Sequence, residues 1–161
     1  MNILTIRGPA SAVFGGWDLG AILTLWQGSP FELVTQTNTT NAFTPGSQRV
    51  NVLRDPALPA DQRRLDRWFD TQAVAAPPAF TFGNSGRALL TGPRLAQLDL
   101  SLLKNHRWKE HWNAQFRFES LDITNHPNFL VPGNILGSAN FGVVSAARVG
   151  RTLQLGMRLE F

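Results

Sequence analysis

Apolar and polar residues alternate without interruption over residues 152–161. Successive side chains of a β-strand point to opposite faces, so this alternation predicts a strand with one apolar and one polar face. The apolar face carries Leu153, Leu155, Met157, Leu159 and Phe161. An apolar strand at the edge of a sheet invites aggregation unless something covers it, and closure of the sheet into a barrel removes such an edge.

Three more segments show the same alternation. Their apolar series are Leu19, Ala21, Leu23 and Leu25 after Trp17; Leu98, Leu100 and Leu102; and Ala114, Phe116 and Phe118 after Trp112. Together the four segments predict an all-β fold, an antiparallel meander of about four long strands near residues 17–27, 94–105, 111–123 and 150–161.

Every charge within the alternating stretches 17–26, 96–102, 112–119 and 152–161 lies on the polar face. In a transmembrane barrel the apolar face contacts lipid and the polar face lines a wet lumen, because a charge facing lipid near the midplane costs about 2 to 4 kcal/mol. The pattern therefore predicts a partial transmembrane β-barrel. The residues expected to face lipid are Leu98, Leu100, Leu102, Phe116, Phe118, Leu153, Leu155, Met157 and Leu159. The charges expected in the lumen are Asp99, Arg117, Glu119, Arg158 and Glu160.

The turn near Trp108 restricts how the second and third strands pair. One register sets Asp99 opposite Arg117, and another sets Asp99 opposite Glu119. Opposite charges across a strand pair contribute about 0.2 to 1 kcal/mol, whereas like charges are unfavourable. We therefore expect Asp99 to face Arg117 directly, and in both registers these two residues share a face.

The connections between the expected strands alternate between short and long. The turn around Trp108 is tight, whereas residues 38–93 and 125–149 are long and rich in Pro, Gly, Asn and Thr. Loops of this length without structure are uncommon in compact soluble domains, but outer-membrane barrels carry them on the extracellular side. Both long connections are therefore expected to be extracellular loops.

Three aromatic residues lie at the other ends of the strands. Trp17 and Trp112 begin strands, and Phe161 ends one. All three are expected at the periplasmic membrane interface, where amphipathic aromatic rings are favoured.

The first long loop contains one segment with helical spacing. Within residues 59–70, Asp61 precedes Leu65, Trp68 and Phe69, which predicts one or two helical turns capped by the aspartate. The following residues, 73–93, are rich in Pro and Gly and are expected to be irregular.

Composition is compatible with a barrel and excludes several other classes. The chain has 161 residues, 43% hydrophobic content and a mean hydropathy of -0.11, with no apolar run long enough for a transmembrane helix. The net charge is +4, but the basic residues are scattered, so no nucleic-acid partner is expected. Cysteine is absent, which excludes disulfides and thiolate metal sites. Residues 1–7 lack a signal-peptide pattern, which in an exported protein points to a missing N-terminal portion.

The chain lacks the common catalytic motifs. It has no phosphate-binding glycine loop, no nucleophile elbow and no HExxH sequence. Its histidines, His106, His111 and His126, are scattered, and Asp99 with Glu119 is expected to balance charge in the barrel wall. We therefore expect no enzyme activity, no cofactor and no metal site.

Nine short motifs carry a resemblance to a known family. They are GGWDL (15–19), QGSPF (27–31), DRWFDT (66–71), FGNSGR (82–87), DLSL (99–102), QFRFE (115–119), NHPNF (125–129), NFG (140–142) and LGMRLEF (155–161). In this order they resemble the C-terminal barrel strands of TonB-dependent outer-membrane receptors, specifically the Oar-like branch with an N-terminal carboxypeptidase-regulatory-like domain. The resemblance runs from about residue 15 to the end of the chain.

The resemblance implies a receptor in the outer membrane of a Gram-negative cell envelope that imports or binds a large ligand. It implies three partners: outer-membrane lipid, the barrel-assembly machinery, which pairs with the last strand and its aromatic Phe161, and TonB, which would act only through N-terminal regions. Residues 1–161 contain no plug domain and no TonB box, and four strands are about half of what the smallest barrels use. We therefore expect the chain to be the C-terminal fragment of such a barrel, with an unidentified ligand.

A second hypothesis is a soluble all-β binding module, for example one that binds glycans. In that case Trp26, Trp68 and Phe80 would serve as stacking platforms in its loops. The two hypotheses differ in one property: a barrel wall needs its apolar face bare, and a soluble module needs that face covered.

Overall fold

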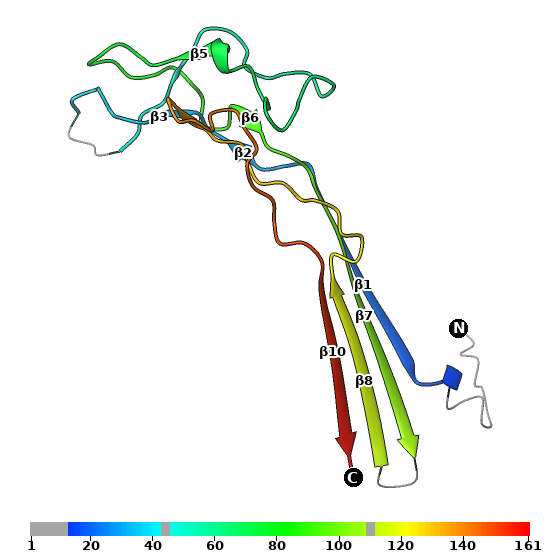
Figure 1. The fold of residues 1–161 in the computed structure, drawn as a ribbon. Helices are drawn as coiled ribbons and strands as arrows, with labels where there is room; N and C mark the ends of the chain where they lie inside the picture. The colour runs from blue at the N-terminus through cyan, green and yellow to red at the C-terminus, as the bar shows by residue number, and fades with distance from the viewer. Residues whose placement is uncertain (1–12, 43–45, 109–111) are drawn as a thin grey trace. The chain divides into compact units, whose positions relative to one another are not determined.

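The structure, a computed structural model, describes residues 13–42, 46–108 and 112–161 (Figure 1). These residues form two compact units, which we describe separately. The sheet unit comprises the described residues of Met1–Leu25, Ala96–His126 and Val149–Phe161, and the loop unit comprises those of Trp26–Leu95 and Pro127–Arg148. No helix in the described part of the chain is long and apolar enough to cross a membrane.

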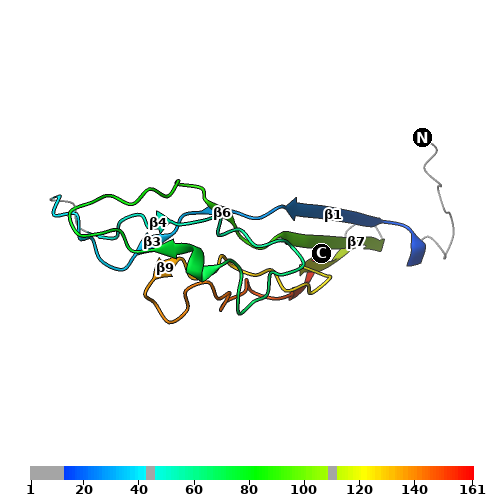
Figure 2. The ribbon, with the colours of Figure 1, turned by 90° about the horizontal axis from the view of Figure 1, so that it is seen from above.

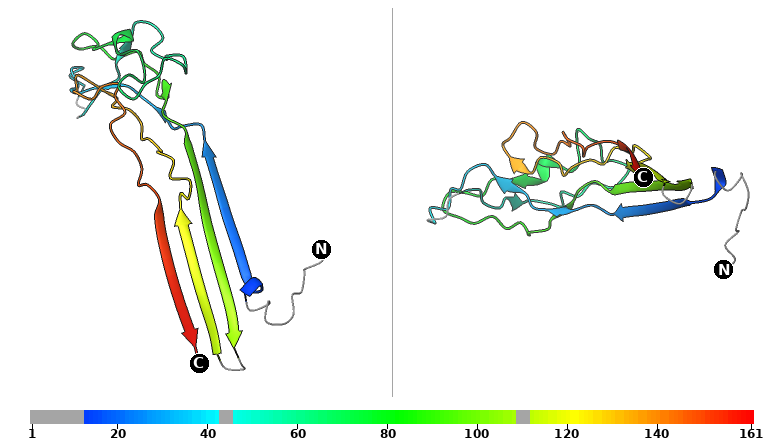
Figure 3. Two further views of the ribbon diagram at one scale, coloured as in Figure 1. Left: turned by 45° about the vertical axis from the view of Figure 1, so that its right-hand side comes forward. Right: turned by 90° about the horizontal axis from the view of Figure 1, so that it is seen from below.

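Four long strands build the sheet unit. They are β1 (Trp17–Trp26), β7 (Leu95–Trp108), β8 (Trp112–Leu121) and β10 (Thr152–Glu160), and their order in the sheet is β1-β7-β8-β10. Neighbouring strands run in opposite directions (Figures 1 and 3). The predicted antiparallel meander is confirmed. β7 is longer than expected by three residues at its C-terminal end, and the expected strand start at residue 111 lies outside the described residues.

The register keeps the expected faces but not the expected charge pair. Ser101 lies opposite Glu119, and Leu103 lies opposite Arg117. Asp99 lies two residues before Ser101, on the same side of the sheet. It is therefore directly opposite neither Arg117 nor Glu119. The prediction that Asp99 and Arg117 are directly opposite is therefore wrong, although the two residues share a face as expected.

Pairing near the turn explains this register. β7 continues to Trp108, which lies opposite Trp112, so backbone pairing extends almost to the turn. The expected charge pair would leave the last residues of β7 without partners in β8, and one exposed ion pair contributes too little to compensate. Asp99 has other partners: its carboxylate accepts hydrogen bonds from the backbone N–H of Asp122 at 2.9 Å and from the Gln97 amide at 2.8 Å.

Short strands and one 3-10 turn organise the loop unit. β2 (Pro30–Phe31) pairs antiparallel with β6 (Leu90–Thr91), β3 (Val34–Thr35) pairs parallel with β9 (Ile135–Leu136), and β4 (Asn51–Val52) pairs antiparallel with β5 (Val74–Ala75). Figure 2 shows β3, β4, β6 and β9 within this unit. The pairs join segments that are far apart in the sequence.

The loop unit has its own hydrophobic core. The core residues are Phe31, Leu33, Val50, Phe69, Val74 and Leu90. Phe69 lies at the centre, with its ring 6.1 Å from that of Phe31 and 5.1 Å from that of Phe141. Residues 38–93 and 125–149, expected to be long loops, fold against each other in the described part of the loop unit, because together they supply enough apolar side chains to bury.

Residues 59–70 do not form the helical turns that Asp61 was expected to cap. They are turns and bends, and the only regular helix among the described residues of this loop is the 3-10 turn η1 (Thr71–Ala73). Asp70, not Asp61, is the capping residue. Leu65 is exposed and Phe69 is fully buried, so the apolar residues of the segment do not share one helical face.

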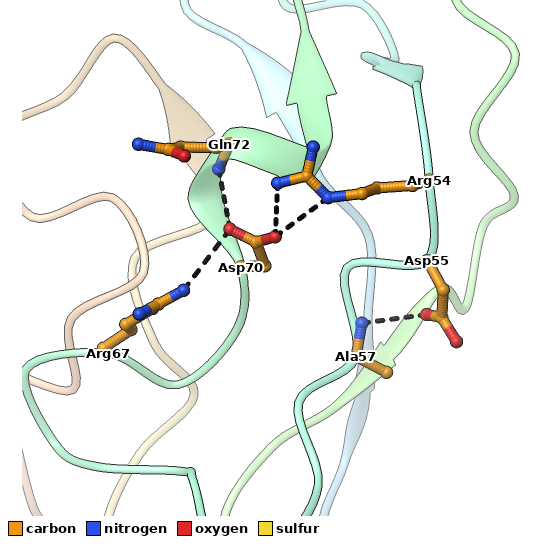
Figure 4. Close-up of polar contacts among 6 residues, drawn as sticks. All are labelled: Arg54, Asp55, Ala57, Arg67, Asp70 and Gln72. Atoms are coloured by element: carbon orange, nitrogen blue, oxygen red, sulfur yellow. Dashed lines mark hydrogen bonds and ion pairs between the residues drawn. The ribbon is translucent and has the colours of Figure 1, made fainter.

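Asp70 fixes η1 through several hydrogen bonds (Figure 4). Its carboxylate accepts the Gln72 N–H at 3.2 Å, binds the Arg54 guanidinium at 2.7 Å, and lies 3.5 Å from the Arg67 guanidinium. The hydrogen bond from Arg54 lowers the pKa of Asp70; burial opposes this shift, and the Gln72 N–H and the two positive charges add to it. The ionised form of Asp70 is therefore favoured in the folded loop unit.

Asp70 should make the stability of the loop unit depend on pH. Its folded pKa lies below its unfolded value, so its contribution is present above the unfolded pKa and is lost as the pH falls through the folded pKa. We expect Asp70→Asn to cost about 1 kcal/mol near neutral pH, because Arg54 is largely exposed, and to cost progressively less as the pH falls below the unfolded pKa of the carboxyl. Hydrogen exchange of the Leu53 amide, which donates to the Ala73 carbonyl, measures the opening of this part of the loop unit.

Asp55→Asn is the control, because the Asp55 carboxylate accepts only a backbone N–H in Figure 4. An equal pH effect in this variant would contradict the assignment to Asp70.

Candidate membrane-facing surface

One face of the sheet unit is apolar across its strands. Leu102, Phe118 and Leu155 lie side by side on β7, β8 and β10 in a single cross-strand row. Met157 lies next to Phe116 and Leu159 next to Ala114 in the rows below. In each strand every second side chain points to the same face of the sheet, so the nine residues predicted to face lipid lie on one face.

Within the sheet unit, no described residue covers this face. Leu155 is 68% exposed and Met157 81% exposed, whereas Leu102 and Phe118 in the central strands are half-buried by their neighbours in the sheet. Every buried hydrophobic side chain that the structure describes belongs to the loop unit. A large uncovered apolar face is the feature that distinguishes a membrane-contacting wall from a soluble module.

The opposite face is polar and concave. A hollow of about 470 Å³ lies against it and is lined by residues from all four strands. Among them are Gly20, Asp99, Ser101, Glu119, Thr152 and Gln154. The sheet therefore curves around its polar side, as the wall of a barrel with a wet lumen does.

The charges on the polar face are paired within strands. Arg117 lies 3.8 Å from Glu119, and Arg158 lies 2.7 Å from Glu160. The Asn113 amide donates to Glu160 at 3.1 Å. With Asp99, all five residues predicted as lumen charges lie on this one face.

Two of the predicted interface aromatics contact each other. The rings of Trp112 and Phe161 are stacked, with centroids 5.5 Å apart and an interplanar angle of 28°. Both residues lie on the apolar face at the end of the sheet where β7 and β10 end (Figures 1 and 3).

Trp17 would lie at the same depth in the membrane as Trp112 and Phe161 only if the strands are tilted relative to the membrane normal. Its ring lies 5.1 Å from the Lys104 ammonium, and the row through Lys104 continues to Phe116 and Met157. Phe161 is four residues further along β10 than Met157. Strands about 4.8 Å apart and tilted by about 40° shift in depth by roughly four residues over three strand steps. A tilt of this size brings Trp17 level with Phe161 if it lowers β1 relative to β10.

Lys104 is a residue of this surface that the sequence pattern did not identify. It lies opposite Phe116, on the apolar face. Its ammonium donates to the carbonyls of Val13 and Gly15 and lies over the Trp17 ring, so the charge is directed to the end of the sheet. A long basic side chain directed in this way keeps its charge at an interface while its stem covers apolar surface. The converse exception is Leu103, which faces the polar side opposite Arg117.

The titratable residues outside this surface form no evident chemical site. Among the described residues, no group of three or more His, Asp or Glu side chains could hold a metal ion. His106 lies on β7 opposite Ala114, and His126 is exposed at the end of the sheet unit. His111 lies outside the described residues. The prediction that the protein is not an enzyme stays a prediction.

The aromatic residues of the alternative hypothesis differ in their surroundings. Trp26 is 59% exposed and Phe80 is 74% exposed. Trp68, however, packs against the core of the loop unit, donates its indole N–H to the Thr91 carbonyl at 2.9 Å and lies 5.8 Å from the Arg63 guanidinium. Trp68 is therefore a structural residue and not a free stacking platform.

A protein-family model described as "Outer membrane beta barrel domain" matches residues 1–154. No curated protein and no solved structure matches the chain.

Proposed function

The chain belongs to the outer membrane beta barrel domain family, and on this premise we propose that it is the C-terminal barrel portion of a TonB-dependent receptor of the Oar-like branch. As a member of the family it is an outer-membrane barrel protein. The receptor role, the Gram-negative envelope and transport of a ligand are the finer parts of the proposal, and the motifs quoted from the sequence support them.

The observation that carries the proposal is the two-faced sheet. Its apolar face is uncovered, its polar face is concave, and the ion pairs of Arg117 and Arg158 lie on the concave side. In water the bare face would be a liability, whereas in a bilayer it contacts lipid and the paired charges stay in the lumen.

The sheet needs additional strands before it can close. β1 and β10 are its two edges, and the smallest known barrels use about eight strands. We propose that β1 pairs with a strand encoded before this segment and that β10 closes the barrel against the first strand of the receptor. The barrel-assembly machinery would bind at β10, and TonB would act only through regions outside this chain.

The genomic sequence directly upstream of Met1 tests the receptor proposal. We expect an open reading frame that continues into further alternating strands and, before them, into a plug domain with a TonB box. In a host without TonB, ligand uptake by that complete receptor should then be lost, while its insertion into the outer membrane should be unchanged. An upstream sequence that encodes barrel strands but no plug would refute the receptor role and leave the membrane-barrel assignment intact.

A further inference from the structure

The loop unit contains a polar hollow that the barrel role does not use. Its volume is about 370 Å³, which is within the range of about 300–1,000 Å³ usual for small-molecule sites. The residues of the hollow on which the inference rests are Glu32, Asn38, Ser47, Gln48, Arg49 and Phe82. All of them belong to the loop unit, and we call this site the loop hollow.

The wall of the loop hollow is rich in hydrogen-bonding groups of balanced charge. It contains one carboxylate, Glu32, and one guanidinium, Arg49, together with amides and hydroxyls. Arg49 donates to the Ser85 carbonyl at 3.4 Å, a long hydrogen bond that uses one of the five N–H donors of its guanidinium. Because the two charges cancel, the wall does not select strongly for anions or for cations.

Gln48 adds an unsatisfied acceptor at this wall. The residue is only 8% exposed, and its amide nitrogen donates to the Thr39 hydroxyl at 2.9 Å. Its Oε1 is buried and has no hydrogen-bond partner among the described residues. A buried polar atom without a partner is costly, and because this oxygen is closed to solvent, a sugar hydroxyl in the hollow can donate to it only after a small movement of the Gln48 side chain.

An exposed aromatic ring completes the hollow. Phe82 lines it and is 76% exposed, which is unusual for a phenylalanine in a folded unit. Gly83, the residue after Phe82, allows the backbone to pass close to the Arg49 carbonyl, with which a Cβ at this position would collide. The segment of Phe82 is thereby held directly against the segment of Arg49, with the ring beside the hydrogen-bonding wall.

We propose that the loop hollow binds a neutral oligosaccharide of two or three sugar rings. A sugar ring presents hydroxyl groups around its edge and a C–H face, which match the hydrogen-bonding wall and the Phe82 ring respectively. The balance of Glu32 and Arg49 disfavours strongly charged ligands. This inference concerns the loop unit alone and does not require that the protein is a receptor.

Cysteine protection tests the site directly, because the chain has no cysteine of its own. The full chain carrying Ser47→Cys, refolded in detergent micelles, is labelled with a maleimide in the presence of maltotriose, cellotriose or chitotriose. At a ligand concentration about ten times the Kd, we expect one of these sugars to slow labelling about tenfold by occupancy. Ser145→Cys is the matched control: it is also exposed and in the loop unit, it does not line the hollow, and its labelling should not change.

Saturation-transfer NMR on the chain without introduced cysteines provides a second measurement. We expect Phe82→Ala and Glu32→Gln each to weaken sugar binding about tenfold. Phe80→Ala should bind as the unmodified chain does, because Phe80 is equally exposed but does not line the hollow. Near-ultraviolet circular dichroism verifies the folded state of each variant.

Three results would overturn the proposal. One is the absence of both protection and saturation transfer for all three sugars with folded protein. Another is protection by the zwitterionic tripeptide trialanine but by none of the sugars, which would assign a peptide site. The third is sugar binding that both Phe82→Ala and Glu32→Gln leave unchanged, which would place the sugar elsewhere.

Discussion

Replacing Leu155 with arginine is expected to destabilise the inserted barrel by about 2 to 4 kcal/mol, the cost of a charge facing lipid near the midplane. Leu155 lies in the middle of β10, on the apolar face and opposite Phe118, and it is 68% exposed. The measurement is denaturant unfolding of a complete receptor that carries this segment, folded into lipid vesicles, with the heat-modifiable gel band as the readout of the folded barrel.

Gln154→Arg is the matched control, since it places the same charge one residue away on the polar face. Gln154 lies opposite Glu119, so an arginine there gains an opposite charge worth about 0.2 to 1 kcal/mol and should be tolerated. Leu153→Arg, nearer the end of the strand, should cost less than Leu155→Arg, because the penalty falls toward the interface. Equal costs at Leu155 and Gln154 would contradict the assignment of the two faces.

The faces of the sheet could be predicted from the sequence because they depend only on local alternation. A side chain at position 153 shares a face with those at 155 and 157 whatever strand lies beside them. Phe116 and Leu155 therefore appear on the predicted face although their neighbours were not known. The concavity of the polar side could not be predicted, because curvature depends on the twist and pairing of all four strands.

The register was predicted incorrectly because a single charge pair was given too much weight. The favoured pairing of Asp99 with Arg117 contributes at most about 1 kcal/mol, less than the backbone hydrogen bonds that the extension of β7 to Trp108 adds. Lys104 was missed for a related reason. The expected strand was judged by its apolar centre, and only the structure shows that this charge reaches the Val13 and Gly15 carbonyls beyond the strand end.

The fold of the loop unit could not be predicted from the sequence, because its contacts join residues that are far apart along the chain. Phe31, Val50, Phe69 and Val74 come from separate segments without a shared period, and they meet only in the folded core. The strands that connect these segments are two residues long, too short to leave an alternating pattern. Proline and glycine content identified the segments correctly as connections, but it cannot distinguish an irregular folded unit from a flexible loop.

Phe161 is expected to contribute to assembly of the barrel. Its ring stacks on Trp112 at 5.5 Å on the apolar face, at the end of β10, the strand that we propose the assembly machinery pairs with. Replacing it with lysine removes a stacking interaction of about 0.5 to 1.5 kcal/mol and puts a charge in its place, so we expect roughly threefold to tenfold less heat-modifiable barrel in outer-membrane fractions. Glu160→Lys changes the neighbouring residue on the polar face and should have a smaller effect, while Phe161→Trp, which keeps an aromatic ring over Trp112, should restore insertion. If Phe161→Lys inserts as well as the unmodified receptor, neither the stack nor the terminal aromatic is part of the assembly signal, and the proposed partnership of β10 with the machinery is wrong.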